Sequence, residues 1–374
     1  MTAPDQRVLV VCFAILFTMP CHAQTTLKDA YKDYFLTGAA LNQSQFSGVA
    51  TCEVSLITAQ FNSISPENVL KWSSVHPTPN HYDFTAADRY VQFGETHHMF
   101  IVGHNLIWHY QTPAWVFQDE TGKPVDRATL LERMREHIST VVGRYRGRIA
   151  GWDVVNEALN DNGTLRRSPW LQIIGEDYLV KAYQFAHEAD PQAQLYYNDY
   201  LLELPAKRAG AIALIQKLQA QGVHVAIGLQ GHYWLDRPTT AEIDEAIKAF
   251  SNLGLNVMIT ELDVDALPLP ANPLTLTADS DFELKPELNP YTNGLPDAVQ
   301  QTLAKRYADL FAVFLKHRDA IKRVSFWGVT DADSWLNYWP VRGRTNHPLL
   351  FDRRCIPKPA FDAVIRAAHS TASP

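Results

Sequence analysis

Basic clusters and long apolar runs are both scarce in this chain of 374 residues, and each scarcity excludes a class of function. The 33 Lys and Arg are outnumbered by 40 Asp and Glu, which gives a formal net charge of -7. Nucleic-acid binding needs a basic face for the phosphates, so this balance argues against a nucleic-acid partner. Beyond residues 1–23 no stretch is apolar enough to cross a bilayer, so we expect no membrane contact in the mature protein.

Cysteine is rare too, with four residues in the whole chain. No two of them have the short spacing of a zinc site, and His104 and His109 lack the helical i, i+4 spacing of zinc-binding histidines. The first expected strand is not followed by a Gly-rich phosphate loop, which argues against a dinucleotide-binding sheet. We therefore expect neither a metal nor a cofactor.

The first 23 residues are typical of an export signal. Arg7 precedes an apolar run from Val8 to Met19, and Ala23 suits a cleavage site. The apolar run is too short to span a bilayer, as in a cleavable signal peptide. We therefore expect a mature chain of residues 24–374 that is secreted or periplasmic.

Removal of this signal would leave two cysteines, Cys52 and Cys355. An exported protein can join such a pair, and the even count permits a disulfide. Two buried free thiols are the alternative, and the sequence leaves this choice open.

Short apolar, β-branched or aromatic runs alternate with longer helical patterns along the rest of the chain. None of these runs is joined to the next by a two-residue hairpin turn, and parallel strands require longer crossovers. The pattern predicts an α/β protein with a single (β/α)8 barrel rather than an open doubly wound sheet. The eight expected strands are Phe35–Leu41, Phe61–Ile64, Met99–Leu106, Ile149–Val155, Gln194–Tyr197, Val225–Leu229, Asn256–Leu262 and Val324–Trp327.

The connection after the seventh expected strand is unusually long. Residues 266–296 hold several prolines and little periodicity. The loops that follow barrel strands build the active-site face, so we expect this segment to form part of a cleft wall. A surface excursion with no role is the alternative.

Two glutamates at the ends of expected strands are the candidate catalytic groups. The apolar run before Asn156 and Glu157 would deliver both side chains at the carboxyl end of a strand, where barrel enzymes place catalytic residues. Glu261 ends a second short β run in the same way. Hydrolysis of a glycosidic bond needs two such carboxylates, one to protonate the leaving oxygen and one to attack the anomeric carbon.

Several motifs in register across residues 30–367 are similar to those of family 10 glycoside hydrolases, most of which are endo-β-1,4-xylanases on a (β/α)8 barrel. Leu70 stands where the family motif Glu-Asn-x-Met-Lys-Trp has Met, and Tyr110 stands where Gly-His-Thr-Leu-Val-Trp-His-Ser-Gln has Ser. The matching segments are Glu67–Trp72, Gly103–Gln111, Tyr197–Tyr200, Gln230–His232, Trp327–Asp331, Trp335, Leu350–Asp352 and Pro357–Phe361.

The resemblance implies a retaining mechanism with Glu157 as general acid/base and Glu261 as nucleophile. Asn156 would bind the sugar 2-hydroxyl, a contact that strengthens in the transition state. His232 and Asp263 would keep Glu261 ionised. Asp263 shares a strand face with Glu261, as Gln230 does with His232, because side chains alternate along a strand.

The resemblance also implies which side chains hold the sugars. One group would grip the sugar on the glycone side, a second would line the reactive subsite, and Tyr197 would be a platform on the leaving-group side. Indole faces suit the apolar C–H faces of a pyranose. The glycone group is Glu67, Asn68 and Lys71; the reactive-subsite group is His104, Trp108 and Gln111, roofed by Trp327 and Trp335.

The expected partner is therefore xylan or its oligosaccharides, bound by a monomer. A β-1,4-glucanase, or a mixed xylanase and glucanase, is the first alternative. A bulky Trp335 should crowd the C5 hydroxymethyl that distinguishes glucose from xylose. A catalytically silent carbohydrate-binding barrel is the second alternative, although such a protein would normally have lost Glu157 or Glu261. Trp152 is expected to be core, whereas Trp115, Trp170, Trp234 and Trp339 could be either core or site.

Overall fold

The computed structural model describes residues 25–272, 275–276 and 279–370, so the expected export signal lies outside the described residues. Every pairing between its named strands is parallel. The strands are β1 Leu36–Leu41, β2 Ser63–Pro66, β3 Phe100–Ile107, β4 Gly151–Asn156, β5 Gln194–Asp199, β6 Ala226–Leu229, β7 His232–Trp234, β8 Val257–Asp265 and β9 Ile321–Phe326.

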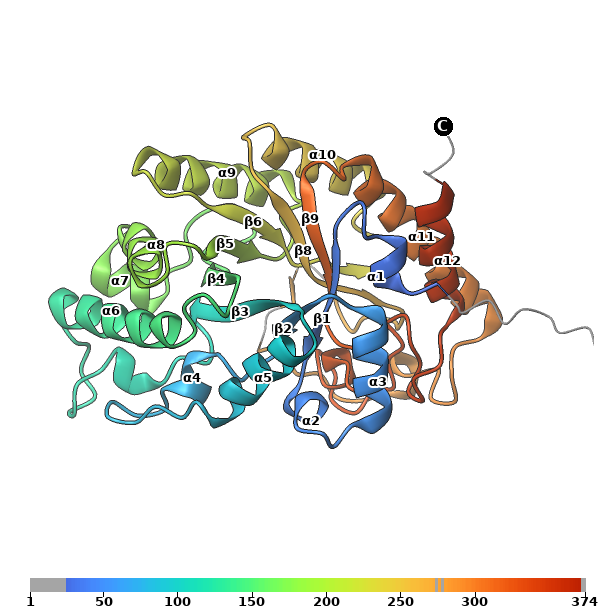
Figure 1. Cartoon of the computed structure of the whole chain (residues 1–374), viewed down its shortest axis with the longest axis horizontal. Helices are drawn as coiled ribbons and strands as arrows, with labels where there is room; N and C mark the ends of the chain where they lie inside the picture. The colour runs from blue at the N-terminus through green and yellow to red at the C-terminus, as the bar shows by residue number, and fades with distance from the viewer. Residues whose placement is uncertain (1–24, 273–274, 277–278, 371–374) are drawn as a thin grey trace, which may run out of the picture.

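Eight of these strands close into a ring (Figure 1). The order runs β6-β5-β4-β3-β2-β1-β9-β8, and a further pairing of β6 with β8 completes the circle. The first strand therefore pairs with the last, β1 with β9. The expected (β/α)8 barrel is confirmed.

The helices lie around the outside of this ring (Figure 1). The longer ones follow the expected signals: on α6 the buried residues Leu130, Met134, Ile138 and Val141 form one stripe, and a capping box of Thr239 and Glu242 begins α10. No helix in the described part of the chain is long and apolar enough to cross a membrane. The helices are α1 Leu27–Ala30, α2 Gln43–Phe46, α3 Thr51–Gln60, α4 Trp72–Val75, α5 Thr85–Thr96, α6 Arg127–Arg144, α7 Pro169–Ile174, α8 Tyr178–Ala189, α9 Pro205–Ala220, α10 Thr240–Ser251, α11 Asp297–Lys316 and α12 Pro359–Ser370.

The sixth strand position is split into two pieces, which the sequence did not indicate. The chain bends at Gly231 (φ 82°), and β7 then pairs with the outer end of β8. A Cβ at Gly231 would lie 2.9 Å from the Ile259 side chain, so glycine fits both the backbone angle and the space. The bend carries His232 and Trp234 to the carboxyl-end face of the barrel.

The layer between strands and helices is tightly packed around Trp152, which is fully buried. A Cβ at Gly103 on the neighbouring strand would lie 2.1 Å from the Trp152 ring, so only glycine leaves room there. The expectation that Trp152 is a core residue is confirmed.

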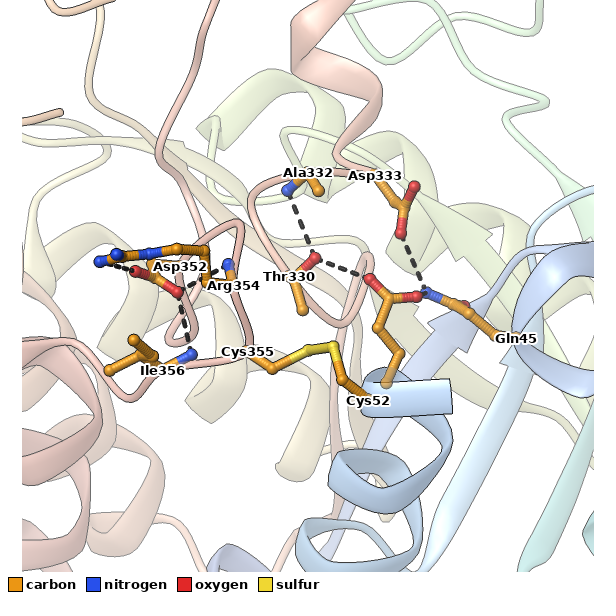
Figure 2. Close-up of a disulfide and its surroundings, with 10 residues drawn as sticks. Gln45, Cys52, Thr330, Ala332, Asp333, Asp352, Arg354, Cys355 and Ile356 are labelled. Carbon is orange, nitrogen blue, oxygen red and sulfur yellow. Dashed lines mark hydrogen bonds and ion pairs between the residues drawn. A yellow bond between two sulfur atoms is a disulfide. The ribbon is translucent and has the colours of Figure 1, made fainter. Parts of the chain in front are cut away.

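A disulfide joins Cys52 on α3 to Cys355, which precedes α12 (Figure 2). The two residues are 303 positions apart in sequence, with their Cα atoms 6.5 Å apart. Glu53, the next residue after Cys52, accepts hydrogen bonds from Gln45 and Thr330. The choice that the sequence left open is thus resolved in favour of a disulfide.

Replacing both cysteines by serine is expected to lower the free energy of unfolding by about 2–4 kcal/mol, because the bond restricts a very long loop in the unfolded chain. Urea unfolding of the oxidised protein measures this loss. Reduced wild type is the matched control and should resemble the double variant. Equal stability of oxidised wild type and the double variant would contradict the expectation.

Candidate active site

A cavity of about 520 Å³ opens at the carboxyl ends of the barrel strands. All but one of the expected catalytic, substrate-binding and supporting residues line it, brought together from β2, β3, β4, β6, β7, β8 and the segment after β9. These residues are Glu67, Asn68, Lys71, His104, Trp108, Gln111, Asn156, Glu157, Gln230, His232, Glu261, Asp263, Trp327 and Trp335.

Glu157 follows β4 with a left-handed backbone (φ 54°), which is uncommon for a residue other than glycine. The Glu157 N–H donates to the Asn198 carbonyl (2.9 Å), and the Glu157 carbonyl accepts from Arg166 Nε (3.2 Å). Its carboxylate accepts hydrogen bonds from Trp108 Nε1 (2.9 Å) and Gln230 Nε2 (3.0 Å). These contacts fix both ends of the residue.

The environment of Glu157 favours its protonated form. Burial raises the pKa of Glu157 above its usual value, and the negative charge of Asp199 adds to this shift. The hydrogen bonds from Gln230 and Trp108 act in the opposite direction but do not cancel it.

The environment of Glu261 on β8 favours its ionised form. Asn198 Nδ2 donates to its Oε1 (2.8 Å), and His232 Nε2 lies 3.1 Å from its Oε2. Burial alone would raise the pKa of Glu261, but these two hydrogen bonds and the charge of His232 lower it below its usual value. Glu261 is therefore the carboxylate that stays ionised.

His232 supplies the positive charge next to Glu261. Its Nδ1 lies 3.1 Å from Asp263 Oδ1. Burial alone would lower the pKa of His232, but the carboxylates of Asp263 and Glu261 raise it to about 10. His232 is thus a cation at neutral pH, which agrees with the supporting role expected for His232 and Asp263.

Two asparagines connect the glutamates. Asn156 Nδ2 donates to Glu157 Oε1 (3.1 Å), and Asn198 Nδ2 donates to Asn156 Oδ1 (2.8 Å) as well as to Glu261. Thr260 Oγ1 in turn donates to Asn198 Oδ1 (2.6 Å). The spacing of the two carboxylates is therefore set by side chains on β4, β5 and β8.

The side chains after β2 and β3 form a polar group beside the glutamates. Lys71 Nζ donates to Asn68 Oδ1 (3.1 Å) and Gln111 Oε1 (2.9 Å), and it lies over the Trp108 ring. Burial lowers the pKa of Lys71 to about 8 and raises the pKa of Glu67 to about 7. His104 Nδ1 pairs with Asp153 (2.9 Å), which fixes the orientation of the imidazole.

Two stacked tryptophans form an aromatic wall of the same cavity. The rings of Trp335 and Trp339 stack at 4.7 Å, and Trp335 Nε1 donates to Asp263 Oδ2 (2.8 Å). Trp335 also lies 4.9 Å from the His232 ring. Trp339, to which the sequence assigned no role, is thus a site residue.

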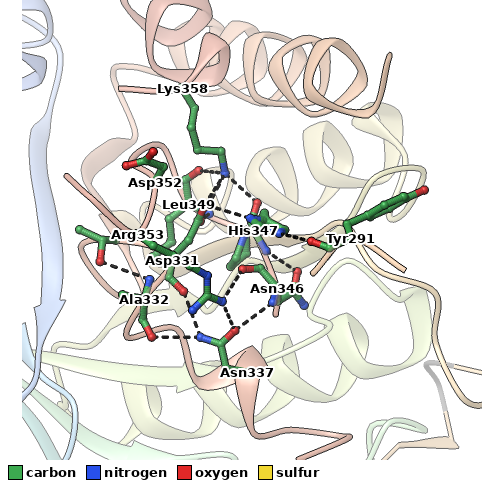
Figure 3. Close-up of polar contacts among 12 residues, drawn as sticks. Tyr291, Asp331, Ala332, Asn337, Asn346, His347, Leu349, Asp352, Arg353 and Lys358 are labelled. Atoms are coloured by element: carbon green, nitrogen blue, oxygen red, sulfur yellow. Dashed lines mark hydrogen bonds and ion pairs between the residues drawn. The ribbon is translucent and has the colours of Figure 1, made fainter. Parts of the chain in front are cut away.

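A buried polar network holds the segment that carries this wall (Figure 3). Lys358 Nζ donates to Asp331 Oδ2 (2.9 Å) and to the carbonyls of His347 and Leu349. The Asn337 side chain donates to the Asp331 carbonyl (3.0 Å) and accepts from the Asn346 N–H (2.9 Å). These hydrogen bonds fix the backbone on both sides of Trp335 and Trp339.

The long segment after β8 reaches this cavity, as expected for residues 266–296. Leu276 and Asp279 both line it. Tyr110 Oη, from the segment after β3, donates to Asp279 Oδ2 (2.8 Å). Since β3 and β8 are opposite one another in the ring, this hydrogen bond spans the mouth of the barrel.

The platform predicted for Tyr197 is wrong. Its ring is fully buried outside the cavity, and its hydroxyl donates to Asp199 Oδ2. Tyr196 and Asn198 are the residues of β5 that point into the barrel, so Tyr197 between them points away. Tyr200, three residues on, lines the cavity instead.

Other lining residues were not singled out from the sequence. Arg166, Leu201 and Trp234 also line the cavity. Within the described residues, no group of three or more His, Cys, Asp or Glu is arranged to hold a metal ion. The two buried glutamates have opposite pKa shifts, which suit an acid and a nucleophile acting on a glycosidic bond.

Comparison with known proteins agrees with this chemistry. The family model "Glycosyl hydrolase family 10" matches residues 26–367. Endo-1,4-beta-xylanase A of Xylanibacter ruminicola is 46% identical over 92% of this chain and 93% of its own length. Beta-1,4-xylanase of Dictyoglomus thermophilum is 41% identical over 91% and 90%.

Solved structures give the same result. A GH10 endoxylanase from a sugarcane soil metagenome has a TM-score of 0.88 and 45% identity, covering 91% of this chain and 99% of its own. Xylanase B of Clostridium stercorarium F9 has a TM-score of 0.82 and 37% identity, covering 91% and 99%. The chain belongs to glycosyl hydrolase family 10.

Proposed function

We infer that this protein is an endo-1,4-β-xylanase that hydrolyses internal bonds of xylan with retention of anomeric configuration. The activity is that of relatives which match nearly the whole chain at 39–46% identity. The observation that supports the assignment of roles is the pair of buried glutamates with opposite pKa shifts.

In the proposed first step, Glu261 attacks the anomeric carbon while Glu157 protonates the leaving oxygen. The product is a glycosyl ester of Glu261. In the second step Glu157, now ionised, takes a proton from water, and the water replaces Glu261 at the anomeric carbon. Asn156, which donates a hydrogen bond to Glu157, would bind the sugar 2-hydroxyl as charge develops.

The wall of tryptophans supports a preference for xylan over glucan. Trp335 is fixed by its hydrogen bond to Asp263 and its stacking on Trp339. A rigid indole cannot move aside for a C5 hydroxymethyl, so a glucose unit there would be crowded.

We also propose that the protein is a monomer and that residues 1–23 direct its export.

A time course with soluble xylan, followed by proton NMR, tests the function. We expect early xylo-oligosaccharides with the β configuration, followed by slow mutarotation. Early α products would contradict the two-step mechanism. Cleavage of β-glucan or cellulose in preference to xylan would favour a glucanase, and no cleavage of any of them would favour a silent binding barrel.

The pH dependence of kcat/KM on xylan is expected to be bell-shaped. Activity needs ionised Glu261, whose pKa lies below the ordinary 4.5, so the acidic limb should fall below pH 4.5. Activity also needs protonated Glu157, whose pKa lies above 4.5, so the alkaline limb should fall above it. Initial rates across buffered pH values measure both limbs; a profile without an alkaline fall would contradict the role of Glu157.

A further inference from the structure

The indole of Trp234 lies against the cavity. It lines the cavity and is half-buried, yet it is not among the half-buried apolar side chains that pack on the core. Trp115, by contrast, packs on the core and meets Trp72 edge to face. Within the described ranges, the Trp234 side chain makes no hydrogen bond or ring contact. The position of its half-buried ring is therefore not explained by packing on the core.

The backbone of Trp234 is firmly held. Its N–H donates to the Arg237 carbonyl (2.8 Å), and its carbonyl accepts from Arg306 Nε (3.1 Å). Arg306 Nη2 also donates to the Pro238 carbonyl (2.6 Å). An indole on such a backbone is in place before a ligand arrives, which lowers the entropy cost of binding.

Strand geometry relates Trp234 to the nucleophile. His232 and Trp234 are two residues apart on β7, so they point to the same face, about 7 Å from each other along the strand. His232 contacts Glu261. Tyr233 points the other way, where its hydroxyl donates to Glu203 (2.6 Å). Trp234 therefore extends the catalytic face outward from Glu261.

The order of strands places Trp234 on one side of the catalytic pair. Glu157 follows β4 and Glu261 lies on β8, so a line between them divides the ring into β5 and β6 on one side and β3, β2, β1 and β9 on the other. Lys71 and Gln111, after β2 and β3, lie on the second side, where the glycone sugar is expected. Trp234 lies on the first side, on β7, which continues from β6.

Other lining residues on this side of the catalytic pair suit the same kind of ligand. Tyr200 and Leu201 also line the cavity there. Lys207 Nζ covers one face of the Tyr200 ring, 3.2 Å from its centroid, and Arg166 donates to the Tyr200 hydroxyl (2.9 Å). These contacts fix Tyr200, so the leaving-group half of the cavity combines fixed aromatic and apolar surfaces with a polar edge.

We propose that Trp234 is the platform for a xylose unit on the leaving-group side of the scissile bond. Its flat indole takes the C–H face of a pyranose, which is the role that the sequence assigned to Tyr197. The proposal rests on the proposed function, since it assumes that Glu157 protonates the leaving group. It identifies Trp234 as a residue that selects substrates with sugars beyond the cleavage point.

The test compares two substrates. Xylohexaose places sugars on both sides of the cleaved bond, whereas 4-nitrophenyl β-xylobioside has no sugar on the leaving-group side. Trp234→Ala should lower kcat/KM for xylohexaose about tenfold, the scale of one lost aromatic platform. The same variant should leave kcat/KM for the nitrophenyl substrate within about twofold, and Trp234→Phe should recover most of the loss on xylohexaose.

A second readout follows the covalent intermediate. At high xylotriose concentration an acceptor hydroxyl can replace water: the bond from the anomeric carbon to the acceptor oxygen forms, the bond to Glu261 breaks, and Glu157 takes the hydroxyl proton. A platform for the acceptor raises the fraction of transfer products. Trp234→Ala should therefore shift the product ratio from transfer towards hydrolysis, which a general loss of folding would not do.

Tyr338→Ala is the matched control, because Tyr338 is an exposed aromatic (59%) that does not line the cavity. It should leave both substrates and the transfer ratio unchanged. Equal losses by Trp234→Ala on both substrates, or no loss on xylohexaose, would overturn the proposal. If wild type cleaved neither xylohexaose nor the nitrophenyl substrate, the proposed function itself would fail.

Discussion

Glu261→Ala is expected to lower kcat for xylan by about four to six orders of magnitude, the range measured when a catalytic nucleophile is removed. The loss follows from the chemistry, because no glycosyl ester can form without this carboxylate. The surrounding donors, Asn198 and His232, would remain in place. Binding of xylohexaose, measured by calorimetry, should therefore persist.

Azide distinguishes this loss from a general defect. The missing carboxylate leaves space on the α face, so azide can displace an activated leaving group and give an α-glycosyl azide. Glu261→Gln is the matched control, since it keeps the volume and should not admit azide. Retained turnover of xylan by Glu261→Ala, or a β-configured azide product, would contradict the assignment of Glu261 as nucleophile.

Glu157→Ala is expected to have very different effects on different leaving groups. Xylan has a poor leaving group that needs protonation, so its kcat should fall by about 10²–10⁴-fold. A dinitrophenyl xylobioside leaves without a proton, so formation of its glycosyl ester should change little. The alkaline limb of the pH profile for that first step should disappear, because it reports the Glu157 proton.

Azide again gives the control for this variant. It can attack the ester of Glu261 from the face that Glu157 no longer occupies, which gives a β-glycosyl azide and faster turnover. The two alanine variants should thus yield azides of opposite configuration. Equal losses on xylan and the dinitrophenyl substrate, with no rescue by azide, would show that Glu157 is not the acid.

Much of the barrel could be predicted because its signals are local. The expected strand Phe35–Leu41 differs from β1 by one residue, and Asn256–Leu262 lies within one residue of the start of β8. The split at Gly231 was missed because β7 is only three residues long and pairs with a distant segment. A strand of that length gives no pattern of its own.

The site residues that belong to sequence motifs were mostly predicted correctly. The residues whose role depends on which way the side chain points were missed. Alternation along a strand correctly put Glu261 with Asp263 on one face, and it also separates Asn198 from Tyr197 on β5. Applied there, it would have placed Asn198 inside and Tyr197 outside. Trp234 could not have been assigned to the cavity from sequence. A tryptophan that lines a cavity differs from a core tryptophan in its contacts, and the sequence does not show these contacts.

The disulfide has a consequence for how the molecule comes apart. A closed barrel has one seam where the two ends of the chain meet, here between β1 and β9, and a barrel that opens by fraying from its termini must part along that seam. Cys52–Cys355 fastens the elements on either side of it, and Tyr31 Oη adds a hydrogen bond to the Val364 carbonyl (2.6 Å). The oxidised enzyme should therefore have a longer lifetime on heating than the reduced enzyme. The disulfide prevents unfolding that starts at either terminus, so the interior must unfold as a whole.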